Sequence, residues 1–325
     1  MQRIRYISVR VVRATLLILL IATLNFVIVR LAPGDPASVI AGESGAADPV
    51  FMAQLREEFR LNDPLLSQLW AYISGILQLD LGYSHRQRTA VITLIMDRLG
   101  ATLLLTTTGF LLALLFGITL GAVAAFNRGG LIDRAINAVN LFLFATPIYW
   151  IGLIGVLIFS AQLNWLPAYG AASLIQPRDW VGFLTDRASY LILPALTLGL
   201  SYTPIYARLM RASMLEVKDQ EFVRLARSKG LSSARVAVKH VMRNSMLPVI
   251  TFAGVHAGNL LGGSILVETI FGWPGLGRLT LDSMLVRDYN VLLGIFFICS
   301  VLTILFNLIT DLLYSVVDPR IDIEG

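Results

Sequence analysis

"LGATLLLTTTGFLLALLFGITLGAVAAF", residues 99–126, contains no charged side chain over 28 residues. A helix of about 20 apolar residues is long enough to cross the hydrocarbon core of a bilayer. The stretch is also rich in Gly, Ala and Thr, which let helix backbones approach closely within a membrane bundle. It therefore predicts a transmembrane helix packed against other helices.

Similar stretches recur along the chain. Four more are free of Asp, Glu, Lys and Arg and long enough to span: 135–177, 188–207, 244–267 and 289–310. A sixth, 14–29, is shorter, but snorkelling of its flanking arginines lengthens it. With 56% hydrophobic and 14% charged residues, the composition excludes an ordinary soluble domain. We predict an all-α polytopic membrane protein with six transmembrane helices.

The first span has two interpretations, because basic residues precede an apolar stretch in cleaved signal peptides as well as in anchors. The stretch ends in "VRLAPGDP" (29–36), which lacks a clear small-x-small cleavage site, so the sequence favours an uncleaved anchor. We expect 1–31 to hold a cytoplasmic N-terminus and the first span, 32–98 an external segment, and 99–325 the core.

The distribution of Lys and Arg predicts the orientation. With the N-terminus inside, the cytoplasmic pieces 1–13, 127–134, 208–243 and 316–325 hold 16 of these residues, against 9 on the other side. Both termini are therefore expected in the cytoplasm. Topology accounts for the net charge of +5, so nucleic acid is not needed as a partner.

Short amphipathic helices are expected in the external segment. Asp48-Pro49 and Asp63-Pro64 each read as an N-cap followed by proline at the first helical position. Apolar residues follow both at helical spacing: Phe51, Leu55 and Phe59 behind the first, and Leu66, Leu69, Trp70, Ile73 and Leu77 behind the second. We expect these helices on the outer membrane face or against the bundle.

The densest basic cluster lies in residues 212–245, here called the basic loop. In its first half, Phe222 and Ala226 share one predicted helix face, and Glu221 and Arg224 can pair on another. Gly230 suits a helix end that needs a left-handed residue. Ser232 or Ser233 can then cap a second helix, with Arg235, Lys239 and Arg243 opposite Val238, Val241 and Met242.

Two interpretations of the basic loop follow from its residues. It can be a solvated segment that anchors topology by attraction to anionic lipid. It can also be a folded contact for another protein. Charge by itself favours the first, whereas a capped, hinged pair of helices is more than an anchor requires.

The motif in this loop resembles a known family. "ARSKG" (226–230) within "EFVRLARSKGLS", followed by "RN" (243–244) and Pro248, is similar to the cytoplasmic signature of ABC-importer permeases of the peptide/nickel subclass. The broader ABC signature begins Glu-Ala-Ala, where this chain has Arg224 and Leu225. Collinear blocks extend the resemblance over the whole chain: "VRLAPGDP" (29–36), "ATPIYWIGLI" (145–154), "LNWLPAYG" (163–170), "ETIFGWPGLGRL" (268–279) and "VVDPRI" (316–321).

The resemblance implies a type I importer permease fold, with a coupling helix inside, in a bacterial inner membrane. It implies an ATPase-coupling surface at Glu221, Phe222, Val223, Arg224, Ala226, Arg227, Lys229 and Gly230. Exposed Phe222 and Val223 would form an apolar plug for an ATPase groove. This chain has no Gly-Lys-Ser/Thr phosphate loop, so ATP and Mg would act on partner chains.

The family further implies a second permease subunit, two ATPase subunits, an extracytoplasmic solute-binding protein and membrane lipid as partners. The cargo would be a peptide or a related small solute. The loop at Trp273, Pro274 and Gly275 would be an external gate or a contact for the binding protein. A plain irregular connection is the alternative.

Polar residues of the fifth span are candidates for the translocation path. His256, Asn259 and Ser264 can line a pathway or simply form interhelical hydrogen bonds. Glu268 belongs to the same polar set, and because it is near the outer end it can instead simply be solvated. Arg208 and Arg211 read as topology anchors, with Asp311 a candidate partner. No chemical role is predicted for Arg208, Arg211 or Asp311.

No catalytic or metal site is expected. His85, His240 and His256 are far apart in sequence, and none has a cysteine partner. A stand-alone secondary transporter or channel would show an inverted repeat or mid-membrane ionisable groups, and neither is clear. An intramembrane enzyme would need a nucleophile and a base in reach, and His256 has no obvious partner.

Overall fold

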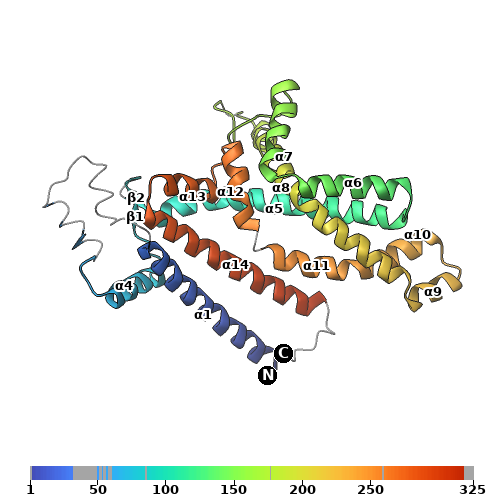
Figure 1. Cartoon of the computed structure of the whole chain (residues 1–325), viewed down its shortest axis with the longest axis horizontal. Coiled ribbons are helices and arrows are strands. Elements are labelled where there is room, and N and C mark those ends of the chain that lie inside the picture. The colour runs from blue at the N-terminus through green and yellow to red at the C-terminus, as the bar shows by residue number, and fades with distance from the viewer. Residues whose placement is uncertain are drawn as a thin grey trace. The chain divides into compact units, whose positions relative to one another are not determined.

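The computed structural model describes residues 2–31, 50, 53, 56–57, 61–84, 86–175, 177–257 and 260–317 (Figure 1). These residues are almost entirely helical, and the strands are limited to the antiparallel pair β1 (Tyr83–Ser84) and β2 (Thr89–Ala90). They form two compact units. The terminal unit comprises 1–100, 279–309 and 315–325, and the central unit comprises 101–278 and 310–314.

The terminal unit contains α1 (Gln2–Leu31), α4 (Leu65–Leu77), the β1–β2 pair, most of α13 (Leu276–Leu285) and most of α14 (Tyr289–Val317). Helix α4 packs against α1, as one of the two placements expected for the amphipathic helices. It begins one residue later than predicted, with Pro64 rather than Asp63 at the N-cap. The helix predicted around Phe51, Leu55 and Phe59 lies outside the described residues.

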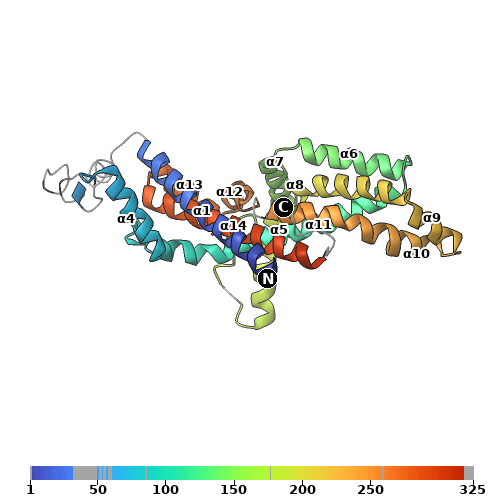
Figure 2. The ribbon, with the colours of Figure 1, turned by 90° about the horizontal axis from the view of Figure 1, so that it is seen from below.

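The central unit is built around α8 (Trp180–Lys218), a helix of 39 residues that continues through Pro194 and Pro204. It contacts α6 (Leu131–Ala145), α7 (Ile148–Gly155) and α11 (Arg243–Ala257). The unit is completed by the larger part of α5 (Val91–Phe126), by π-helical η1 (Val156–Gln162) and by α12 (Leu260–Phe271). Between α8 and α11 run α9 (Glu221–Ser228), α10 (Ser233–Arg235) and π-helical η2 (Val236–Met242). Figures 1 and 2 both place α9 and α10 at the end of the unit away from α7 and α12.

Helices α5 and α8 approach closely where glycines of α5 face α8. A Cβ at Gly117 would lie 2.4 Å from the Cβ of Tyr206, and one at Gly121 would lie 2.5 Å from the carbonyl oxygen of Ala207. The spacing of these glycines is the small-xxx-small pattern by which membrane helices bring their backbones together. The close packing expected for residues 99–126 is confirmed.

Helices long and apolar enough to span a membrane are α5, α8 and residues 289–308 of α14. The predicted third span becomes a pair, α6 and α7–η1, bent by 104° at Thr146 and Pro147, where proline removes a helical donor. The predicted first span corresponds to α1, a helix of 30 residues that is apolar over Val12–Ile28. The predicted fifth span corresponds to α11 and α12, and residues 258 and 259 between them lie outside the described residues.

Candidate functional site

Helix α9 is attached to the central unit by one apolar face. Val223 and Ala226, three residues apart, are 0% and 6% exposed and pack in a core with Met214 and Val217 of α8. Residues Val236 and Val241 of η2 join the same cluster. The first half of the basic loop is thus a folded extension of the bundle.

The apolar plug expected at Phe222 and Val223 is corrected by this packing. Val223 is fully buried, whereas Phe222 and Leu225 are 38% and 57% exposed. The expectation that Phe222 and Ala226 share a face is also wrong, because Ala226 is buried. The exposed apolar pair was detectable as an i, i+3 spacing, but Val223 and Ala226 have the same spacing, so periodicity could not choose between them.

The exposed pair lies in a segment rich in charged residues. Glu221, Arg224, Arg227 and Lys229 are all exposed. Within the described chain no ion pair joins Glu221 to Arg224, so the predicted i, i+3 pair does not form. The basic groups of α9 are therefore available to a partner.

The left-handed residue expected at Gly230 is confirmed, because this residue has φ +77 and follows Lys229, the C-cap of α9. Glycine adopts such a conformation more readily than any other residue. Ser232 occupies the N-cap of α10, but neither it nor Ser233 makes a capping side-chain hydrogen bond, contrary to expectation. The backbone turns between α9 and α10 without a capping hydrogen bond from either serine side chain.

The second half of the basic loop is π-helical rather than α-helical. In η2, Val236 and Val241 are buried while Val238 is 56% exposed. The prediction placed Val238, Val241 and Met242 on one apolar face, and it is wrong for Val238. A π-helix repeats its hydrogen bonds at i to i+5, so Val236 and Val241 share a face.

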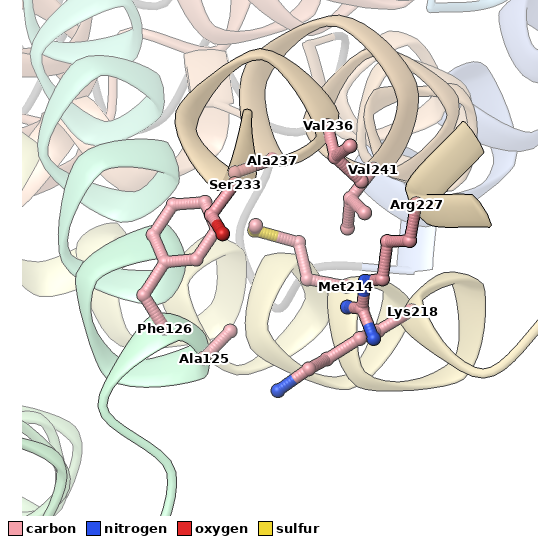
Figure 3. A pocket seen from close by; sticks show the side chains of 9 residues that line it. All are labelled: Ala125, Phe126, Met214, Lys218, Arg227, Ser233, Val236, Ala237 and Val241. Carbon is pink, nitrogen blue, oxygen red and sulfur yellow. The ribbon is translucent and has the colours of Figure 1, made fainter. Parts of the chain in front are cut away.

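A pocket of about 230 Å³ opens where the basic loop meets the ends of α5 and α8 (Figure 3). Its lining is mostly apolar, with two cations and one hydroxyl: Ala125, Phe126, Met214, Lys218, Arg227, Ser233, Val236, Ala237 and Val241. Figure 3 shows the Phe126 ring and the Ser233 hydroxyl across the pocket from the Arg227 guanidinium. No carboxylate lines it.

At the other end of the central unit, Glu268 of α12 is fully buried, so the expectation of a solvated side chain is wrong. Thr102 Oγ1 donates to its Oε1 at 2.8 Å, and the backbone N–H of Arg278 donates to its Oε2 at 3.1 Å. Thr102 Oγ1 also accepts from the N–H of Leu276 at 2.7 Å. Sequence reasoning missed Thr102, whose signal was a hydroxyl within an apolar span.

The segment predicted as an external gate, residues 272–277, is tied to this network. Trp273 is 3% exposed and its Nε1 donates to the carbonyl of Ala101 at 2.8 Å. A Cβ at Gly275 would lie 2.3 Å from Oε2 of Glu268. Of the three predicted residues, only Pro274 is exposed. Trp273 and Gly275 hold the segment in place, and Pro274 is the residue that is accessible to a partner protein.

Of the predicted path residues, His256 lies on α11 and Ser264 on α12. His256 packs beside Phe252 and Tyr202, with ring centroids 4.8 Å and 6.0 Å away, and its buried Nδ1 has no hydrogen-bond partner among the described residues. Ser264 is fully buried and bonds to Glu268. Asn259 lies outside the described residues. Across the described chain no three His, Cys, Asp or Glu side chains gather as a metal site.

Comparison with known proteins identifies the family of this chain. Residues 117–323 match the model of the binding-protein-dependent transport system inner membrane component, and residues 3–106 match the model of its N-terminal region. The chain belongs to this family. It is the permease component of a binding-protein-dependent ABC importer and a non-catalytic inner-membrane subunit. A stand-alone transporter and an intramembrane enzyme are not what the match supports.

The alignments with relatives extend over nearly the whole of this chain. The di/tripeptide transport system permease protein DppB of Pseudomonas aeruginosa is 38% identical, over 93% of this chain and 94% of that protein. The glutathione transport system permease protein GsiC of Escherichia coli is 38% identical, over 98% and 99%. The dipeptide transport system permease protein DppB of Escherichia coli K12 is 39% identical, over 93% and 94%.

The permease fold also matches a solved structure. An inward-facing methionine ABC transporter, MetNI, aligns with a TM-score of 0.56 and 15% identity, over 69% of this chain and 96% of that chain. At this identity the likeness concerns the fold alone. It agrees with the all-α importer permease fold predicted from the sequence.

Proposed function

We propose that the basic loop couples this permease to a separate ATPase subunit, where ATP and Mg act. The supporting observation is the orientation of α9, which is anchored through Val223 and Ala226 and leaves Phe222 and Leu225 exposed between basic groups. An apolar pair inside a charged rim is the composition of a protein contact. Closure of two ATPases would pull on this helix and rock the bundle between inward- and outward-facing states.

The assembly that this implies contains a second permease chain, two ATPase subunits and an extracytoplasmic solute-binding protein. Exposed Pro274 supports a contact with the binding protein at the 272–277 segment. His256, with its unpartnered Nδ1, supports a role on the translocation path together with Asn259 and Ser264. Both termini would lie in the cytoplasm, because the basic segments share that side.

The cargo is proposed to be a short peptide. The relatives at 38–39% identity are named for dipeptides, di/tripeptides and glutathione, which share amide groups and charged termini. Purifying the complex with its binding protein and identifying the retained ligand by mass spectrometry tests this. A retained ligand without an amide bond would contradict the cargo but not the coupling.

The coupling is tested by reversing two exposed charges, Arg224→Glu with Lys229→Glu. Neither residue lines the pocket of Figure 3, and no described residue pairs with them. We expect normal membrane insertion, loss of the ATPase from the purified complex, and loss of uptake. The matched control is Arg134→Glu with Arg178→Glu, which changes the net charge equally at exposed sites outside the loop. Retention of the ATPase by the loop variant would contradict the proposal.

A further inference from the structure

The pocket between the basic loop and the ends of α5 and α8 carries an unbalanced charge. Among its lining residues are Lys218 and Arg227 but no Asp or Glu. Within the described chain no ion pair or hydrogen bond engages either side chain. Two neighbouring cations without a counter-charge favour an anionic occupant.

The remaining lining is apolar apart from one hydroxyl. Phe126, Met214, Val236 and Val241 supply hydrocarbon, and the Ser233 hydroxyl lies across the pocket from the Arg227 guanidinium (Figure 3). Ammonium and guanidinium groups suit a phosphate oxygen. A ligand that matches the two cations and the hydrocarbon carries a phosphate on a short apolar stem.

The size and the position of the pocket narrow the ligand further. Its volume of about 230 Å³ is below the roughly 300–1,000 Å³ of sites for drug-sized ligands. Phe126 ends α5 and Lys218 ends α8, two helices long and apolar enough to span. Phe126 closes the charge-free run of α5, and Lys218 lies eleven residues beyond the run 188–207 of α8, on the side expected to be cytoplasmic. Basic pockets between membrane helices on that side hold lipid headgroups.

We propose that this pocket binds the headgroup phosphate of one anionic phospholipid, with its glycerol and first methylenes against Phe126 and Met214. The lipid would bridge Lys218 of α8 to Arg227 of α9 and so stabilise the folded basic loop. The two interpretations of the loop, lipid anchor and protein contact, then apply to different faces. This proposal does not depend on the ATPase, because the binding needs only this chain and lipid.

The test is native mass spectrometry of the full chain in non-ionic detergent, titrated with phosphatidylglycerol, phosphatidylcholine or glycerol 3-phosphate. We expect one retained phosphatidylglycerol, bound about fivefold or more tightly than phosphatidylcholine. Lys218→Gln should abolish that preference. The matched control, Lys239→Gln, removes the same charge from the same loop but does not line the pocket and should keep it.

A second variant keeps the proposal testable if Lys218→Gln fails to fold. Ser233→Asp places a carboxylate in the pocket at the first turn of α10, where helices accept acidic residues. It should also lose the retained lipid, while its unfolding temperature without added lipid stays unchanged. If Lys218→Gln and Ser233→Asp retain phosphatidylglycerol as well as the control Lys239→Gln does, the proposal is overturned.

Two other outcomes would also overturn it. If glycerol 3-phosphate competes as well as phosphatidylglycerol does, the pocket takes a soluble phosphate and not a lipid. If the lipid is lost when ATPase subunits are bound, the cations belong to that protein contact. Retention of the lipid in the assembled complex supports the proposal.

Discussion

Arg211 of α8 binds Asp133 of α6 through two parallel hydrogen bonds, from Nε to Oδ1 and from Nη2 to Oδ2, both at 2.8 Å. The backbone N–H of Gly129, in the turn after α5, also donates to Asp133 Oδ2 at 2.9 Å. The sequence suggested Asp311, whose side chain lies outside the described residues, as a partner for Arg208 or Arg211. The pair that Arg211 forms joins the α5–α6 turn to α8, the helix that leads into the basic loop.

Arg211→Lys should lower the unfolding temperature of the permease, because an ammonium cannot form two parallel bonds with one carboxylate. Thermal unfolding in detergent measures this. The control is Arg134→Lys, since Arg134 is exposed and adjacent in sequence to Asp133. Equal shifts in both variants would show that the paired geometry contributes nothing.

Gly121→Ala should destabilise the bundle. The added methyl would meet the Ala207 carbonyl at 2.5 Å and force α5 away from α8. Gly100→Ala lies in the same helix with no atom within 4 Å of its new Cβ, and it should be neutral or stabilising by up to about 1 kcal/mol. The yield and the unfolding temperature of the two variants measure this difference in stability. A loss of stability in both would contradict the packing explanation, because alanine favours a helix more than glycine does and Gly100→Ala adds no close contact.

Val223→Ala and Phe222→Ala should separate stability from coupling. Val223 is buried, so its truncation should cost roughly 1–3 kcal/mol of folding stability. Phe222 is exposed, so its truncation should leave the unfolding temperature unchanged but weaken retention of the ATPase. Unfolding curves and co-purification measure the two effects. The reverse pattern would place the ATPase on the other face of α9.

Glu268→Ala should loosen the 272–277 segment. It removes the acceptor of Thr102 Oγ1 and of the Arg278 N–H, and each buried donor left unpaired costs about 1–3 kcal/mol. Hydrogen exchange should rise across residues 272–279. Thr102→Val should raise it at the same amides, and the double variant should add little, because both substitutions break one network. Fully additive effects would mean that the two residues act separately.

Much of the fold followed from local composition. Residues 99–126 predicted both a span and its close packing, since apolar length and small residues act within one helix. Gly230 predicted the hinge for a similarly local reason, because glycine is the usual left-handed residue at a helix end. Family blocks spread along the chain then sufficed to predict an importer permease.

The candidate site was harder to predict because its details depend on distant contacts. Phe222 with Leu225 and Val223 with Ala226 are equally plausible buried pairs until α8 and η2 cover one of them. Val238 was misplaced because η2 is π-helical, and the apolar pattern does not reveal that. Glu268 appeared solvated because its partner Thr102 lies 166 residues earlier in the chain.

The order of residues was thus enough to determine that this chain enters a membrane, which segments are apolar enough to do so, and where its basic loop bends. Hydropathy and backbone preference act over a few neighbouring residues, so they can be read along a line. Folding alone decided which face of α9 is exposed, that Arg211 holds Asp133, and that Lys218 and Arg227 share a pocket. Burial and charge pairing depend on atoms brought together from far apart, and no linear pattern contains those contacts.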